Sequence, residues 1–166
     1  MVQIILASAS PSRYRLLESV GIIPEVIVSG VNEESPEFDL LNPSELVLAL
    51  ATLKAQAVKE LAPVNSIIIG CDSTFEFEGK SLGKPGSHEK AIQRCKQLSG
   101  KSGLLHTGHC AIDLRSGKEV SKLSTSKVQF AQMTNEEITD YVNSGEPLNV
   151  AGYFRIIIKT YRKSCR

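Results

Sequence analysis

The order of apolar and polar residues predicts strands and helices that alternate along the chain. Short apolar runs, typical of strands, occur at 4–6, 24–30 and 66–72, and two longer β-rich runs occupy 104–114 and 120–132. Between them, segments that open with a helix-capping residue lie at 10–20, 42–61, 87–99 and 134–143. This alternation predicts an α/β fold with the sheet at its centre.

The apolar face of each helix is expected to form the core. In the first three helices these faces consist of Leu16, Leu17 and Val20; of Leu46, Leu50, Leu53, Ala57 and Leu61; and of Ala91, Ile92, Cys95 and Leu98. Three consecutive isoleucines, at 67–69, predict a central strand that is covered on both faces. Residues 74–82 predict a hairpin that turns at Gly79-Lys80, and residues 115–118 predict a second hairpin turn.

Length and composition narrow the class of protein. The 166 residues, of which 42% are hydrophobic, suffice for one domain with a substantial core. A formal net charge of +1 argues against a general nucleic-acid coat, which would be strongly basic. No apolar run approaches the length of about 18 residues of a membrane span, and no basic region precedes the first apolar run. We therefore expect a cytoplasmic protein that binds neither nucleic acid nor a membrane.

The cysteines and histidines do not predict a transition-metal site. The four cysteines are widely spaced and form no CxxC pair, which is typical of free thiols in a reducing compartment. His106 and His109, followed by Cys110, fall within a predicted strand. Because residues three apart on a strand point to opposite faces, these two histidines are not expected to share a metal.

The first candidate site is the strand-to-helix junction at residues 6–13. Ser8, Ser10 and Ser12 place hydroxyl groups there, and Arg13 adds a planar fork of donors in the first helical turn. Ser10 is expected to cap the helix, with Pro11 at its first position. Free backbone N–H groups and the positive end of the helix dipole favour an anion here. The alternative is an ordinary strand–helix unit whose serines only cap and whose arginine faces water.

Two carboxylates and two lysines form the second candidate group. Asp72 follows the central strand, at the end of which open α/β sheets bind ligands, although it could instead cap the next turn. Glu33 lies in an acidic loop that is either solvated or binds a metal on a polyphosphate. Lys84 stands between Gly83 and Pro85, which are expected to hold it in a defined direction, as a phosphate-binding ammonium requires. Lys54 lies beside the apolar face of its helix, where a lysine most often faces solvent.

Together these residues suit a nucleotide polyphosphate with Mg²⁺. Lysine and arginine bind phosphates, and carboxylates hold a metal or activate water. The chain has no GxGxxG and no GxxxxGK[ST] motif, so neither of the commoner phosphate loops accounts for the pattern.

Motifs along nearly the whole chain resemble those of the Maf family, the septum-formation-inhibitor-like nucleotide pyrophosphatases. In chain order these motifs are Leu6 to Arg13, Gly30 to Glu34, Leu50 to Ala55, Gly70 to Ser73, Gly83 to Pro85, Leu98 to Lys101, Thr107-Gly108, Gly145 to Leu148 and Ala151-Gly152. Each motif is short, but their order and spacing together are specific to the family.

The resemblance implies a fold and an assembly. The family has a Maf/Ham1-like α/β fold, a single elongated domain with helices flanking a mixed central sheet and a deep cleft, and often forms homodimers. This domain would span residues 1–166. Since residues 153–158 lack the polar residue and glycine-rich turn of the family, we expect the C-terminal end to be truncated or diverged after about residue 152.

The resemblance also implies an activity and the residues that perform it. Family members hydrolyse a nucleoside triphosphate between its α- and β-phosphates, which gives a monophosphate and pyrophosphate; non-standard or pyrimidine nucleotides are the expected substrates. By this resemblance Asp72 is the general base or a metal-associated carboxylate, and Glu33 helps to hold Mg²⁺ or Mn²⁺. The substrate-binding residues would be Ser8, Ser10, Ser12, Arg13, Lys54, Ser73 and Lys84.

Departures from the family pattern leave a second hypothesis open. Ser12-Arg13 stands where many members have two arginines, and Ser73 stands where threonine is common. The altered C-terminal end, rather than these two changes, allows a catalytically impaired regulator, linked to cell division, that binds nucleotides without hydrolysing them. The preferred nucleobase does not follow from the sequence.

Overall fold

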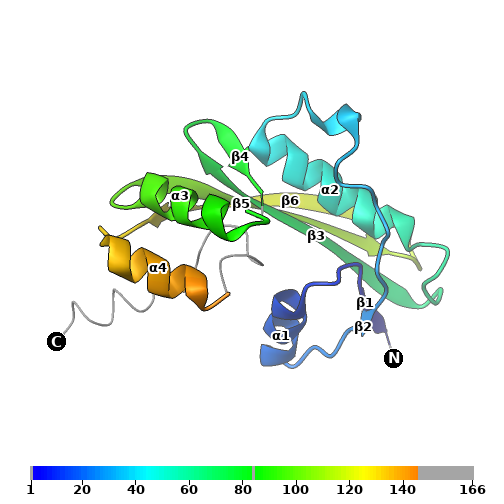
Figure 1. Ribbon diagram of the computed structural model, residues 1–166. Helices are drawn as coiled ribbons and strands as arrows, with labels where there is room; N and C mark the ends of the chain where they lie inside the picture. The colour runs from blue at the N-terminus through cyan, green and yellow to red at the C-terminus, as the bar shows by residue number, and fades with distance from the viewer. Residues whose placement is uncertain (1, 84, 146–166) are drawn as a thin grey trace. The chain divides into compact units, whose positions relative to one another are not determined.

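A computed structural model describes residues 2–83 and 85–145. The elements are β1 (Gln3–Leu6), α1 (Pro11–Ser19), β2 (Glu25–Val26), a 3₁₀ turn (Pro36–Phe38), α2 (Pro43–Ala57), β3 (Ser66–Phe77), β4 (Lys80–Leu82), α3 (His88–Leu98), β5 (Ser102–Asp113), β6 (Lys118–Gln129) and α4 (Asn135–Asn143) (Figure 1). Lys84, the Ala151-Gly152 motif and the predicted change after residue 152 lie outside the described residues.

The strands of the described residues form one mixed sheet. Its order is β2-β1-β3-β5-β6, and β4 pairs with β3 beside this path. β1 pairs in parallel with β2 and with β3, whereas β4 pairs antiparallel with β3. The predicted α/β class, the mixed sheet and the central position of β3 are therefore confirmed. The elongated shape and the deep cleft stay predictions.

The chain divides into two compact units. The first contains residues 2–73 and 107–124, and the second contains residues 74–106 and 125–145. The chain passes from the first unit to the second within β3, between Ser73 and Thr74. It returns within β5, between His106 and Thr107, and passes to the second unit again within β6, between Ser124 and Thr125. The expectation of a single domain stays a prediction.

The core of the first unit depends on close packing between α2 and the sheet. Its buried residues are Ile5, Ala7, Ala51, Ala55, Val58, Ile68, Cys110 and Ile112. A Cβ at Gly70 would overlap the Ala51 carbonyl oxygen and lie 2.8 Å from the Cβ of Ala55. Glycine on β3 and alanines on α2 thus bring the helix backbone close to the strand, because no larger side chain separates them.

The second unit has an aromatic core beneath α3 and α4, which lie side by side in Figure 1. The buried residues are Phe75, Phe77, Ala91, Cys95, Leu98, Val128, Phe130, Ile138 and Val142. The rings of Phe75 and Phe130 pack edge to face with their centroids 5.5 Å apart. The predicted inward face of α3 is confirmed, since Ala91, Cys95 and Leu98 are buried and Ile92 is partly buried.

The apolar faces predicted for the first two helices are mostly wrong. α1 has no buried residue, and Leu16 and Val20 are 68% and 69% exposed. On α2 the buried side chains are Pro43, Val47, Leu50, Ala51, Lys54 and Ala55. Of the five residues predicted to face inward on α2, only Leu50 is buried. Because α2 approaches Gly70 closely, the helix buries the face that carries Ala51 and Ala55 rather than the face that carries Leu46 and Leu53.

Helix starts are predicted better than helix faces. Asn42 and Thr134 cap their helices as expected, and each forms a capping box, with Glu45 and Glu137 respectively. α1 begins at Pro11 as predicted, but the Ser10 side chain makes no capping hydrogen bond, so that prediction is wrong.

The strand expected to end at Asp72 is longer than predicted. β3 continues to Phe77, so that Asp72 lies inside it. Its parallel pairing with β1 nevertheless ends at the Leu6–Ile69 pair, and Asp72 lies just beyond the carboxyl end of β1. The following hairpin turns at Glu78 and Gly79, which both have positive φ angles, one residue earlier than expected.

Candidate functional site

The first unit brings Asp72 together with Lys54 and Glu33. Gly70 lets α2 approach β3 at Ala51, and one helical turn further along α2 Lys54 meets Asp72. Lys54 Nζ donates to Asp72 Oδ1 over 2.6 Å and lies 2.7 Å from Glu33 Oε1. The packing of helix against strand thus positions an ammonium group between two carboxylates.

Burial distinguishes the members of this group. The Lys54 side chain is 8% exposed and that of Asp72 is 11% exposed, whereas the Glu33 side chain is 54% exposed. The expectation that Lys54 faces solvent is therefore wrong, because the lysine belongs to the buried face of α2. A buried charge requires a partner of opposite sign, which Asp72 supplies.

Asp72 has the electrostatics of a proton acceptor. Burial raises the pKa of this carboxyl above its ordinary value; Lys54 opposes the change, and the nearby Glu33 carboxylate adds to it. A carboxylate with a raised pKa is a stronger base than an exposed aspartate, and such shifts are common in catalytic groups.

Arg13 is held beside Asp72 by the hydroxyl groups of two serines, one after β1 and one on β3. Its Nη1 donates to Ser8 Oγ over 2.9 Å, and its Nη2 donates to Ser73 Oγ over 3.3 Å. Ser8 follows β1, and Ser73 follows Asp72 on β3, at the edge where the parallel pairing of these strands ends. The arginine thus joins the start of α1 to the residue next to the candidate base.

The remaining predicted site residues are less closely tied to this group. The backbone N–H of Ser10 donates to Ser8 Oγ over 3.3 Å. Ser12 is exposed in the first turn of α1. Lys84 is outside the described residues, so its expected approach to Arg13, Lys54 and Asp72 stays a prediction.

The carboxylates of Glu33 and Asp72 have the chemistry of a magnesium site that substrate would complete. Among the described residues there is no group of three or more histidine, cysteine, aspartate or glutamate side chains that could hold a metal. Mg²⁺ is usually held by one or two carboxylates together with substrate phosphates and water, so these two oxygen donors fit it. They fit Mn²⁺ for the same reason.

Two contacts of the site were not predicted from the sequence. Thr107 on β5 places its Oγ1 3.1 Å from Ser73 Oγ. Cys71 Sγ lies 3.4 Å from His109 Nδ1. Burial raises the pKa of the Cys71 thiol. Burial and the nearby charge of Arg13 lower the pKa of His109. Both groups therefore favour their neutral forms. Both pairs join β3 to β5, and only knowledge of the register of these strands would have revealed them.

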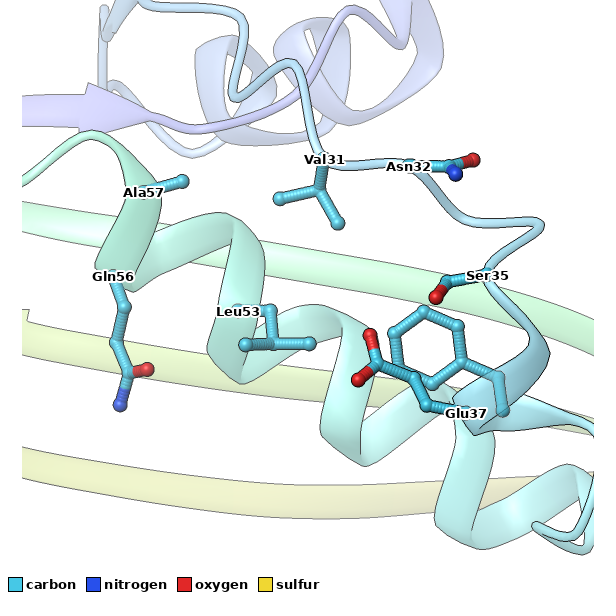
Figure 2. A pocket seen from close by; sticks show the side chains of 8 residues that line it. Val31, Asn32, Ser35, Glu37, Leu53, Gln56 and Ala57 are labelled. Carbon is cyan, nitrogen blue, oxygen red and sulfur yellow. The ribbon is translucent and has the colours of Figure 1, made fainter.

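A separate hollow of about 460 Å³ lies between the acidic loop and α2. Figure 2 shows Val31, Asn32, Ser35 and Glu37 on the loop side and Leu53, Gln56 and Ala57 on the helix side. None of the predicted site residues lines it. The hollow is therefore distinct from the group around Asp72, although Glu33 and Lys54 are neighbours of its lining residues in the sequence.

Comparison with known proteins identifies the family. The family model described as Maf-like protein matches residues 3–159. The chain belongs to the Maf family. Its matched region includes every predicted site residue, from Ser8 to Lys84.

Curated relatives of this Maf chain carry the name nucleoside triphosphate pyrophosphatase. One from Streptomyces coelicolor is 46% identical over 155 residues, which are 93% of this chain and 74% of the relative. One from Salinispora tropica is 45% identical over 159 residues, covering 93% of this chain and 70% of the relative. A third, from a Cyanothece species, is 42% identical over 94% of this chain and 79% of its own length.

Proposed function

We propose that this chain is a nucleoside triphosphate pyrophosphatase, which hydrolyses non-standard or pyrimidine triphosphates to a monophosphate and pyrophosphate. The observation that carries the proposal is the buried Lys54–Asp72 pair, with its N–O distance of 2.6 Å, in the same unit as the Arg13 group. The name shared by relatives that are 42–46% identical supports the same activity.

In the proposed reaction Asp72 acts as the general base. Its carboxylate takes a proton from water while the water oxygen bonds to phosphorus and the P–O bond of the α–β anhydride breaks. The bond electrons pass to the departing phosphate oxygen. The raised pKa of Asp72, caused mainly by burial, suits a group that accepts this proton.

Lys54 and Arg13 stabilise the negative charge of the phosphates in this proposal. Lys54 Nζ has three donor hydrogens, and its two carboxylate partners leave one for a phosphate oxygen. Arg13 has five N–H donors, of which two bind Ser8 and Ser73. Lys84 would add a third cation, and Ser10 and Ser12 would add hydroxyl or backbone donors at the start of α1.

Mg²⁺ or Mn²⁺ is the proposed cofactor, held by Glu33 and Asp72 together with substrate phosphates. When bound, the ion would neutralise phosphate charge and polarise the P–O bonds.

A product analysis of a triphosphate panel tests the proposal. The purified chain is incubated with single canonical and modified nucleoside triphosphates and Mg²⁺ or Mn²⁺, and nucleotide and phosphate products are separated. We expect monophosphate and pyrophosphate in equal amounts. Diphosphate with orthophosphate would contradict the proposal. Triphosphate binding by calorimetry without turnover would instead support the regulator hypothesis.

We propose a cytoplasmic homodimer. Among the described cysteines, Cys71, Cys95 and Cys110 are free thiols, which suits a reducing compartment. No helix within residues 2–83 and 85–145 combines the length and apolar character of a membrane span.

Light scattering tests the proposed dimer. It should give twice the 18.1 kDa mass of one chain, and the mass of one chain would contradict the dimer.

A further inference from the structure

We propose that Thr107 is a positioning residue that holds Arg13 in place through Ser73. This inference rests on the proposed function, because it assigns Thr107 a part in binding the triphosphate. Three contacts link the residues in sequence: Arg13 to Ser8 at 2.9 Å, Arg13 to Ser73 at 3.3 Å, and Ser73 to Thr107 at 3.1 Å. All four residues belong to the first unit.

The helix that carries Arg13 does not itself fix the arginine. α1 has no buried residue, so its packing restrains the side chain little. The orientation of the guanidinium therefore depends on its two serine partners. Ser8 is 7% exposed and receives hydrogen bonds from Arg13 Nη1 and from the Ser10 backbone, so it is well held. Ser73 is half-buried, and its hydroxyl needs a partner of its own.

Thr107 supplies this partner from a rigid position. Its neighbour Gly108 packs so closely on α2 that a Cβ there would overlap the Val47 carbonyl oxygen and lie 2.8 Å from Leu48 Cα. β5 is therefore held against α2 next to Thr107. Threonine also has a stiff, β-branched side chain, which keeps its hydroxyl directed at Ser73.

The hydrogen positions are consistent with this order of contacts. A guanidinium only donates, so Ser73 Oγ accepts from Arg13 Nη2. The serine hydrogen can then point to Thr107 Oγ1, or the threonine hydroxyl can donate to Ser73. Either arrangement selects one rotamer of Ser73 and directs an oxygen lone pair at Arg13. A held arginine loses less conformational entropy when the triphosphate binds.

Substitution of Thr107 tests the inference. Thr107→Val removes the hydroxyl and keeps the branched shape, and Thr107→Ser keeps the hydroxyl. Loss of one hydrogen bond of ordinary strength corresponds to a change of about three- to tenfold. We expect Thr107→Val to raise both KM and the Kd of a non-hydrolysable triphosphate by this factor, with kcat changed less than about twofold. Thr107→Ser should restore most of the affinity.

A matched control and a double variant separate positioning from general stability. Thr52→Val removes another threonine–serine contact of 3.1 Å in the same unit, to Ser121, where no arginine is involved. It should leave KM and Kd unchanged. If Thr107 acts through Ser73, Thr107→Val should have no further effect on Kd in a Ser73→Ala background. Thr107→Ala replaces Thr107→Val in this cycle if the valine variant does not fold.

The outcomes distinguish this inference from the proposed function. Unchanged affinity in Thr107→Val, failure of Thr107→Ser to restore it, or additive effects with Ser73→Ala would overturn the role of Thr107 alone. A wild-type chain that binds triphosphate without hydrolysis would overturn the proposed activity. The Kd values of the Thr107 and Ser73 variants would still test the role of Thr107. A wild-type chain that binds no triphosphate would overturn both.

Discussion

Asp72 and Asp113 lie in the same unit, but their surroundings change their pKa values in opposite directions. Burial raises the pKa of Asp72. Hydrogen bonds from the Arg115 side chain and backbone lower the pKa of the partly exposed Asp113 to about 2. We predict by NMR titration of the carboxyl carbons that Asp72 titrates above the ordinary value of about 3.9 and Asp113 well below it.

The signs of these shifts give opposite contributions to stability. Asp72 binds its proton more tightly when folded, so its contribution is present at low pH and is lost as the pH rises through its folded pKa. Asp113 contributes above its unfolded pKa, and this contribution is lost as the pH falls toward about 2. Arg115→Gln should raise the pKa of Asp113 and leave Asp72 unchanged. An Asp72 titration at or below the ordinary value would contradict the described environment.

Replacement of Lys54 tests how much the ion pair with Asp72 stabilises the fold. Lys54→Met leaves the buried Asp72 carboxylate without its partner at 2.6 Å. We predict a loss of about 3–5 kcal/mol in the free energy of unfolding, the usual cost of removing one partner from a buried ion pair. Mg²⁺ should restore part of this loss, because the two carboxylates are then free to bind it. Urea unfolding with and without Mg²⁺ measures both effects.

The control for Lys54 is a lysine outside the site. Lys101→Met removes an exposed pair with Glu78, 3.5 Å apart, which should contribute little. Equal losses in the two variants, or no response of Lys54→Met to Mg²⁺, would contradict the account of Lys54.

At the scale of single residues the sequence selected residues that the structure brings together, but not all of their contacts. Residue type and position along the chain were enough to select Ser8, Arg13 and Asp72, because polar groups at the end of a parallel strand pair suit ligand binding. The burial of Lys54 was not predictable from periodicity, which favoured the leucine face of α2. Thr107 belongs to one of the family-like motifs, but its contact with Ser73 was not predicted, because the two residues are 34 positions apart and strand register decides that contact.

At the scale of elements, helix starts depend on local sequence and helix faces depend on the neighbouring strand. Asn42 and Thr134 cap as predicted because a capping box needs only four consecutive residues. The face that α2 buries is instead set by Gly70, on a strand that follows it in the chain. If the packing of α2 on β3 had been known, a glycine opposite two alanines would have indicated which face of α2 is buried.

Gly70→Ala tests this packing. The added methyl group would overlap the backbone of α2 at Ala51, which cannot move away as a side-chain tip could. We predict a loss of about 1–3 kcal/mol in unfolding free energy, the usual cost of overpacking. Gly83→Ala, where a Cβ would have no heavy atom within 4 Å, should change stability by less than about 0.5 kcal/mol. Equal effects of the two substitutions on urea unfolding would contradict the close approach.

At the scale of the whole molecule the sequence predicted the class but not the division into units. Alternating strands and helices were enough to predict an α/β fold with β3 at its centre. The boundaries between units fall inside β3, β5 and β6, where no linker or proline marks them. Each core is formed by contacts between residues that are far apart in the sequence, such as Phe75 and Phe130 in the second unit. Local sequence patterns do not predict such contacts.

The central claim is that Asp72 acts as the base in hydrolysis of a triphosphate to monophosphate and pyrophosphate. The most direct measurement compares kcat for pyrophosphate release between the wild-type chain and Asp72→Asn, with Asp113→Asn as a matched control in the same unit. We predict a loss of about 10²- to 10⁴-fold for Asp72→Asn, the usual contribution of a general base, and no loss for Asp113→Asn. Full activity of a folded Asp72→Asn variant would contradict the account.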